Sequence, residues 1–153
     1  MDYLALYVTL KLALVTTVVL IVVAAPVAYL LAYTRFPGKS FVEALIYLPM
    51  ALPPTVIGFY LIIVMGPRGW AGRVWEAATG GSLLFTFLGI TIASIIYSVP
   101  FAVQPMKAAF SRIDRRLLES AYILGLSKRA TFLRVIIPNS ASGIAAAAVL
   151  VFL

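Results

Sequence analysis

Side chains that could take part in chemistry are scarce in this sequence, and they lie outside its long apolar stretches. The chain contains no histidine and no cysteine, which excludes disulfides, His- or Cys-ligated metal sites and histidine-based acid–base catalysis. The acidic residues occur at the ends of the apolar stretches or between them: Asp2, Glu43, Glu76, Asp114 and Glu119. Since no nucleophile–base pair or metal-ligand cluster is present, we expect neither an enzyme nor a cofactor bound by this chain.

One short stretch, Gly38-Lys39-Ser40, resembles the end of a phosphate-binding loop. The full pattern requires a glycine five residues before Gly38, where this chain has Tyr33, and it follows a strand rather than an apolar helix. We therefore expect that the chain does not bind ATP by this route.

The most ordered polar pattern lies at residues 111–138 and predicts two short helices joined at a glycine. Ser111 is expected to cap the first helix, with Asp114 three residues on completing a capping box. Gly125 stands where a left-handed residue ends a helix, Ser127 is expected to cap the second helix, and Pro138 to begin the next apolar stretch. The first helix is expected to be amphipathic, with Ile113, Leu117, Ala121 and Leu124 on its apolar face and Arg112, Arg115, Arg116 and Glu119 on another. We call residues 111–138 the helix–Gly–helix segment; an amphipathic hairpin lying on the membrane surface is the alternative.

Prolines form a second group of candidate residues. Pro49, Pro53 and Pro54 fall in the first half of an apolar stretch, where each removes a hydrogen-bond donor and clashes with the preceding turn. Pro100 and Pro105 are expected to break a later stretch in the same way. Broken backbone at membrane depth is tolerated only where it is buried in protein or lines a wet cavity. The candidates for a solute path are therefore Pro53, Pro54, Thr55 and Gln104, with kinks that serve only helix packing as the alternative.

The composition shows what surrounds these residues. Of the 153 residues, 63% are hydrophobic and only 11% are charged, whereas a soluble domain carries about 25% charged residues. The net charge of +7 could suggest nucleic acid as a partner. The basic residues, however, lie in short segments between apolar stretches, which is typical of membrane proteins. We therefore expect a lipid bilayer as the surroundings and no nucleic acid.

Four apolar stretches follow one another along the chain. The first holds 23 uncharged residues between Lys11 and Arg35, too many for the apolar core of a cleaved signal and enough to cross a hydrocarbon layer about 30 Å thick. The predicted membrane segments are about 7–33, 44–65, 83–106 and 138–153, with the connecting loop at 107–137. We therefore predict one all-α domain over residues 1–153, a polytopic transmembrane helical bundle. The last stretch ends without a flanking charge or cap, so we expect the chain to be C-terminally truncated, in mid-helix.

The charges of the loops predict an orientation. Residues 34–43 and 107–134 together carry nine Lys and Arg residues, whereas the segment before Lys11 and residues 66–82 together carry two. Basic loops stay in the cytoplasm. We therefore expect a multi-pass protein of the cell membrane with loops 34–43 and 107–137 cytoplasmic and its N-terminus outside.

The spacing within residues 119–138 is similar to that of a known family. Glu119-Ser120-Ala121 is followed by three residues, Gly125, nine residues and Val135-Ile136-Ile137-Pro138. This resembles the "EAA" loop of type I, binding-protein-dependent ABC importer permeases, whose pattern is Glu-Ala-Ala, three residues, Gly, nine residues and Ile-x-Leu-Pro. The departures from that pattern are Ser120, Val135 and Ile137, and all three are conservative in size or polarity.

Motifs farther upstream resemble one branch of that family. Arg35-Phe36-Pro37-Gly38-Lys39, the run from Leu48-Pro49 through Leu52-Pro53-Pro54-Thr55 to Tyr60, and Met65-Gly66-Pro67-Arg68-Gly69-Trp70 are similar to molybdate permease subunits. Sulfate and thiosulfate permeases share the Phe-Pro-Gly-Lys turn and a Leu-Pro run, but they usually lack the Pro-Pro continuation.

The resemblance implies a function and a set of partners. It implies a permease subunit of an ATP-driven importer for an oxyanion, molybdate or tungstate, with sulfate or thiosulfate as the alternative. Implied partners are a second permease copy, cytoplasmic ATPase subunits that bind the ATP, and an extracytoplasmic oxyanion-binding protein. The ATPase-coupling residues would be Glu119, Ser120, Ala121, Gly125 and Pro138, with Glu119 orienting the loop through Arg115 or through groups of the ATPase. A channel or a secondary carrier without an ATPase is the rival class.

Overall fold

The computed structural model of the chain describes residues 3–153, and every regular element within that range is a helix. The elements in chain order are α1 (Tyr3–Tyr33), α2 (Lys39–Ala51), α3 (Pro54–Met65), α4 (Trp70–Thr79), α5 (Phe87–Ser111), α6 (Arg115–Ile123), α7 (Lys128–Thr131), the π-helical turn η1 (Phe132–Ile136), α8 (Ile137–Asn139) and α9 (Ala141–Phe152). The predicted all-α fold is confirmed.

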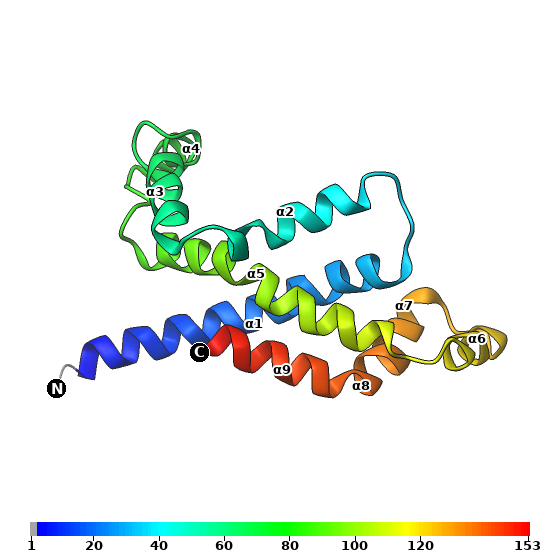
Figure 1. Cartoon of the computed structure of the whole chain (residues 1–153). Helices are drawn as coiled ribbons and strands as arrows, with labels where there is room; N and C mark the ends of the chain where they lie inside the picture. Colours follow the sequence, from blue (N-terminus) through cyan, green and yellow to red (C-terminus); the bar gives the residue numbers. More distant parts are fainter. Residues whose placement is uncertain (1–2) are drawn as a thin grey trace.

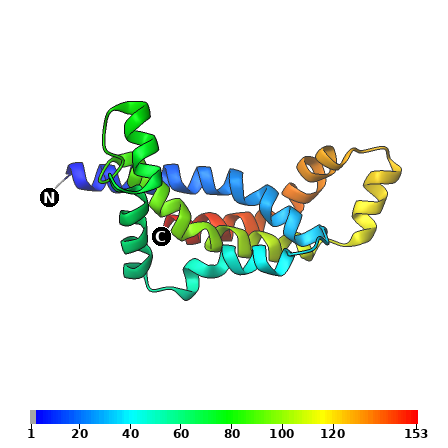
Figure 2. The ribbon, with the colours of Figure 1, turned by 90° about the horizontal axis from the view of Figure 1, so that it is seen from above.

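Helices α1, α5 and α9 lie side by side and form the body of the molecule (Figure 1, Figure 2). Their contacts bury mostly small and branched side chains: Leu20, Ala24 and Ala28 of α1, Ala102, Val103 and Met106 of α5, and Ala147 and Val151 of α9. Gly143 of α9 brings two backbones close together, since a Cβ there would lie 2.3 Å from the Cβ of Ala109. Small residues allow such close approach where lipid provides no hydrophobic force between helices.

The stretch predicted at 44–65 is broken at Pro53 and Pro54, as expected, and forms two helices, whereas Pro49 lies inside the first of them. Helices α2 and α3 meet at a bend of 110°, where Leu52 and Pro53 are extended and Pro54 opens α3 in its first turn. Proline suits the first turn of a helix because the N–H groups there have no partner within the helix. Helix α2 packs along α5, while α3 and α4 stand across the other end of α5 (Figure 1).

The prediction that Pro100 and Pro105 break their helix was wrong, because α5 runs through both. A proline inside a helix costs about 3 kcal/mol. That cost is met here by packing, since α5 contacts α1, α2, α3 and α9 and Pro100 is fully buried.

Residues 66–82 were expected to be a loop, but they contain the helix α4. Gly69 precedes it, and Gly80 follows it in the left-handed conformation, with φ of 73°. The indole of Trp70 is exposed at its first residue. The expected loop therefore contains a short helix that packs against α3.

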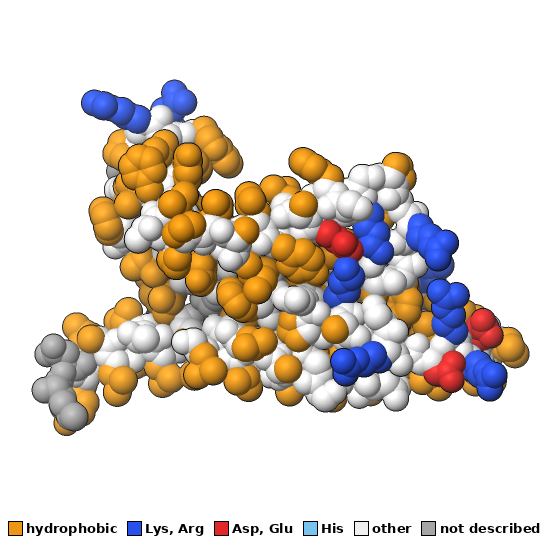
Figure 3. Space-filling model, viewed as in Figure 1, with side chains coloured by type: hydrophobic (Ala, Val, Ile, Leu, Met, Phe, Trp, Pro, Cys, Tyr) orange, Lys and Arg blue, Asp and Glu red, His pale blue; other side chains and the backbone are white. Residues whose placement is uncertain are grey.

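Within residues 3–153, two helices, α1 and α5, are long and apolar enough to cross a membrane. The number of possible crossings rises to four if each bent pair, α2 with α3 and Lys128–Asn139 with α9, counts as one. The loop at residues 34–38 and helices α6 and α7 lie at the same end of the molecule, far from α4 (Figure 1). Charged side chains gather at that end, and hydrophobic side chains cover most of the remaining face (Figure 3). We call it the basic end.

Candidate functional site

The helix–Gly–helix segment projects from the basic end and begins at an aspartate. A carboxylate oxygen of Asp114 accepts a hydrogen bond of 2.9 Å from the backbone N–H of Arg116, which makes Asp114 the N-cap of α6. The prediction that Ser111 caps this helix was wrong, because Ser111 is the last residue of α5. Helix α5 extends that far because Phe110, one residue earlier, is fully buried. Arg112 and Ile113 therefore lie outside α6, contrary to their expected places on that helix.

Helix α6 ends at Gly125 in a closed turn. The N–H of Leu126 donates to the carbonyl of Ala121 at 3.0 Å, and the N–H of Gly125 donates to the carbonyl of Tyr122 at 2.9 Å. These two bonds, with φ of 80° at Gly125, form a Schellman motif, which satisfies carbonyls at the end of a helix. The predicted left-handed helix end at Gly125 is confirmed. A Cβ at this glycine would meet no other atom within 4 Å, so the requirement for glycine is conformational rather than steric.

Ser127 caps the second helix, as predicted. Its hydroxyl oxygen accepts a hydrogen bond of 3.3 Å from the N–H of Ala130. The helix then widens into the π-helical turn η1, where the N–H of Ile137 donates to the carbonyl of Phe132. Pro138 was expected to begin the next apolar stretch, but it lies within the helix, and the long apolar helix α9 begins after Ser140, where the chain bends by 75°. A proline ring clashes with the preceding turn of an ordinary α-helix, and a wider turn relieves that clash.

The apolar face predicted for α6 is only partly correct. Ala121 is 5% exposed and packs inward as expected, and its inward partner is Leu118, at 9%. Leu117 and Leu124 were expected on that face, but both are exposed. The farthest turn of α6 presents Ile123, 85% exposed, and Leu124, 78% exposed, and we call these two residues the apolar tip.

Glu119 and Ser120 face away from the core. The hydroxyl of Ser120 donates to the carbonyl of Arg116 at 2.8 Å, so the serine satisfies its own polar group within α6. Glu119 lines a cavity of about 560 Å³ between α6 and the ends of α1 and α2, together with Arg35, Lys39 and Arg115. Glu119 and Arg115 form no ion pair in the part of the chain that the structure describes. One acidic and three basic groups therefore share this cavity without neutralising one another directly.

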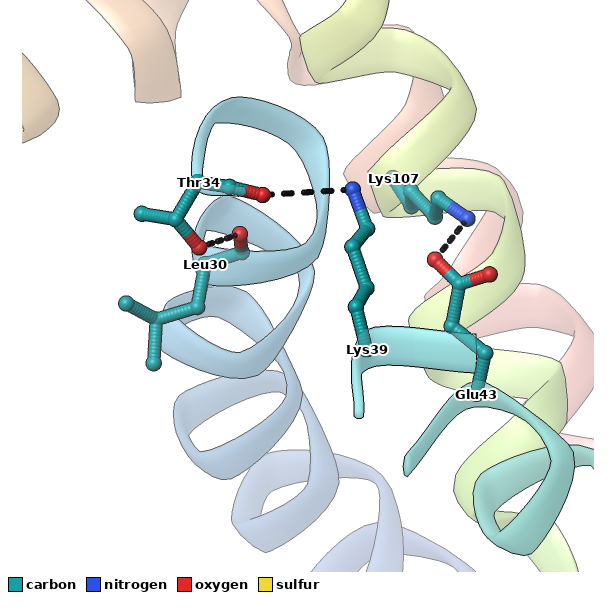
Figure 4. Close-up of polar contacts among 5 residues, drawn as sticks. All are labelled: Leu30, Thr34, Lys39, Glu43 and Lys107. Atoms are coloured by element: carbon teal, nitrogen blue, oxygen red, sulfur yellow. Dashed lines mark hydrogen bonds and ion pairs between the residues drawn. The ribbon is translucent and has the colours of Figure 1, made fainter. Parts of the chain in front are cut away.

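Polar contacts join the helices next to this site (Figure 4). The amine of Lys107 on α5 lies 2.6 Å from a carboxylate oxygen of Glu43 on α2, and both side chains are half-buried. The amine of Lys39 donates to the carbonyl of Thr34 at 3.3 Å, and the hydroxyl of Thr34 donates to the carbonyl of Leu30. These contacts tie together the ends of α1, α2 and α5 from which α6 projects. No local pattern predicted the Lys107–Glu43 pair, since its partners are 64 residues apart.

The candidate path residues lie on two elements. Pro53, Pro54 and Thr55 form the bend between α2 and α3, and Gln104 lies on α5, with all four exposed. The pair of Glu43 on α2 with Lys107 on α5 gives a common reference point for the two helices. Gln104 lies about one helical turn from this pair along α5, and the bend lies about three turns from it along α2. The two parts of the predicted path are therefore separated along α5 rather than placed side by side.

Comparison with known proteins identifies relatives of this fold. Residues 18–153 match the family described as "Binding-protein-dependent transport system inner membrane component". The chain is 45% identical to the molybdenum transport system permease protein ModB of Azotobacter vinelandii, over 99% of this chain and 67% of that protein. It is 37% identical to the probable sulfate transport system permease protein cysT of Chlorokybus atmophyticus, over 95% of this chain and 50% of that protein.

A more distant relative gives the same result. The ModB protein of Escherichia coli strain K12 is 32% identical over 82% of this chain and 55% of its own length. The chain thus spans between half and two thirds of the length of these relatives, which are permease subunits of transport systems and not enzymes. On the family match and these identities together, this chain belongs to the inner membrane components of binding-protein-dependent transport systems.

Proposed function

We propose that this chain is the membrane-spanning permease subunit of an ATP-driven importer and that its helix–Gly–helix segment contacts a separate cytoplasmic ATPase. One observation carries the proposal: the segment is an ordered, capped projection that presents an apolar tip at the basic end of the molecule. Exposed apolar groups at the end of an ordered element are typical of a docking surface. Glu119, Ser120, Ala121, Gly125 and Pro138 are the residues of this coupling site.

The proposed cargo is an oxyanion, molybdate or tungstate. The similarity to the molybdenum permease of Azotobacter vinelandii supports this cargo, and it exceeds the similarity to the sulfate permease of Chlorokybus atmophyticus. Sulfate or thiosulfate is the second candidate, because sulfate permeases are also relatives. The solute path would include Pro53, Pro54, Thr55 and Gln104.

The remaining partners follow from the same proposal. A second copy of the permease would complete the path, and an extracytoplasmic binding protein would deliver the oxyanion at the end that carries α4. Loops 34–43 and 107–137 would face the cytoplasm and the N-terminus the outside, because the basic residues gather in these two loops. ATP would bind to the ATPase subunits and not to this chain.

Uptake by cells tests both the class and the cargo. Cells that lack molybdate and sulfate permeases of their own would express this permease with the ATPase and the binding protein of its transport system. We expect ATP-dependent accumulation of labelled molybdate that excess tungstate inhibits and excess sulfate does not. Accumulation of sulfate alone would replace the first cargo with the second, and uptake that continues without the ATPase would favour a channel or a secondary carrier.

A further inference from the structure

A groove lies between α1 and the second arm of the helix–Gly–helix segment, the helix that starts at Lys128, and none of the five coupling residues lines it. It has a volume of about 270 Å³ and is lined by Pro26 and Tyr29 of α1 and by Lys128, Arg129, Phe132 and Leu133. We call it the α1–α7 groove.

The walls of the groove are apolar, and aromatic contacts join them to the core. The ring of Tyr29 meets the ring of Phe132 edge to face at 5.2 Å, and Phe132 in turn meets the buried Phe110 at 6.2 Å. Pro26 and Leu133 are exposed, and Leu133 leaves 64% of its surface uncovered. The groove is therefore an apolar surface that nothing in the described chain covers.

Two cations stand at the groove, and neither has an acidic partner. Lys128 and Arg129 are exposed in the first turn after the Ser127 cap. Among residues 3–153, the only ion pair joins Lys107 to Glu43. Lys128 and Arg129 therefore have no acidic partner within the described chain. A ligand that complements this groove would carry a negative charge for the two cations and an apolar part for the apolar walls.

The depth of the groove matches the surface of a bilayer. Pro26 precedes Arg35 by nine residues, which is about 13 Å of helix. The groove therefore starts beside the apolar part of α1 and extends toward the end of the molecule where the basic residues begin. Lipid headgroups lie at that level, and basic pockets beside membrane helices bind anionic headgroups.

We infer that the α1–α7 groove binds one anionic phospholipid, with the phosphate against Lys128 and Arg129 and an acyl chain between Pro26 and Leu133. The lipid would link α1 to the second arm of the helix–Gly–helix segment. This inference requires only that the chain spans a membrane, so it holds or fails independently of the proposed cargo and ATPase.

Lipid titration of the purified, delipidated protein in detergent tests the inference. Bound dioleoylphosphatidylglycerol and dioleoylphosphatidylcholine would be counted by native mass spectrometry. We expect one phosphatidylglycerol to remain bound where phosphatidylcholine does not. The double variant Lys128→Gln/Arg129→Gln should bind phosphatidylglycerol about 30-fold more weakly, because each basic side chain near the membrane surface contributes about a fivefold factor.

Two further variants separate the groove from general surface charge. Arg68→Gln/Arg73→Gln removes the same charge from exposed positions near α4 and should leave the affinity unchanged. Leu133→Trp keeps both cations but fills the groove, and it should weaken binding about tenfold by displacing about two methylene groups of the acyl chain. Equal binding of the two lipids by the wild type, an equal loss in the Arg68/Arg73 variant, or full binding by Leu133→Trp would each overturn the inference. Circular dichroism of every variant checks that its helices are intact.

Discussion

At the scale of single residues, Gly125 is the position where backbone conformation and proposed function meet. Its φ of 80° closes α6, and a side chain there would meet no other atom within 4 Å. A substitution therefore changes the turn through backbone strain alone, which is of the order of 1 kcal/mol or more for a residue with a Cβ.

We predict that Gly125→Ala reduces ATP-dependent uptake severalfold while the protein still inserts into the membrane, and that Gly125→Pro abolishes uptake. Proline cannot adopt a positive φ and removes the N–H that bonds to Tyr122. The control is Gly80→Ala, since Gly80 has φ of 73° and open space around it but lies after α4. An equal loss of uptake in this control would show that strain anywhere suffices and would contradict the coupling role.

Glu119 is the single acidic group among the three basic groups of the cavity beside α6. We predict that Glu119→Lys abolishes stimulation of the ATPase by the permease, because a fourth positive charge would repel the other three and push α6 away from α1 and α2. Stimulated ATP hydrolysis in reconstituted vesicles measures this effect. The matched control Glu76→Lys makes the same charge change on exposed α4 and should stimulate the ATPase normally. Normal stimulation by Glu119→Lys as well would remove Glu119 from the site.

At the scale of elements, the apolar tip of α6 is the proposed contact with the ATPase. Ile123 and Leu124 are almost fully exposed, so the variant Ile123→Ser/Leu124→Ser should change the free energy of unfolding by no more than about 0.5 kcal/mol each. We predict that this variant inserts normally but no longer retains the ATPase when the permease is purified through an affinity tag.

The control for the tip is Val74→Ser, which alters an exposed apolar residue of α4 at the other end of the molecule. It should retain the ATPase fully. Retention of the ATPase by the tip variant would show that the contact lies elsewhere on the segment.

Elements whose bounds depend on neighbouring residues in the sequence could be predicted, and those that depend on packing between helices could not. The caps at Gly125 and Ser127 and the bend at Pro53 and Pro54 are local, and the sequence predicted them. The cap at Asp114 was assigned to Ser111, because burial of Phe110 extends α5 beyond the expected start of the next helix. The unbroken passage of α5 through Pro100 and Pro105 was missed for the same reason, since it depends on packing against other helices.

At the scale of the whole molecule, the contacts between distant segments could not be predicted. The Lys107–Glu43 pair and the cavity around Glu119 bring together residues from different helices, and one sequence contains no signal for such pairs. The shared end of loops 34–43 and 107–137 could be predicted, because it follows from the number of crossings and from loop charge.

The close approach of α5 and α9 gives a prediction at this scale. Gly143→Ala places a methyl group 2.3 Å from the Cβ of Ala109, and such overpacking costs about 1–3 kcal/mol. We predict a lower midpoint of thermal unfolding in detergent for Gly143→Ala and partial recovery in Gly143→Ala/Ala109→Gly. The single variant Ala109→Gly measures how much a glycine in α5 lowers the midpoint by itself. If the double variant lowers the midpoint by the sum of the two single effects, the helices do not meet at this point.

The uninterrupted course of α5 has a mechanical consequence. With 25 residues it is a rod about 37 Å long, which contacts α3 at one end and is followed by α6 at the other. A rod of that length that tilts by about 10° around its first turn displaces its far end by about 6 Å. Small rearrangements near α4 would thus be amplified into displacements of the apolar tip that are large enough to engage or release a partner. A force applied to the tip would likewise be transmitted along α5 to the end that carries α4.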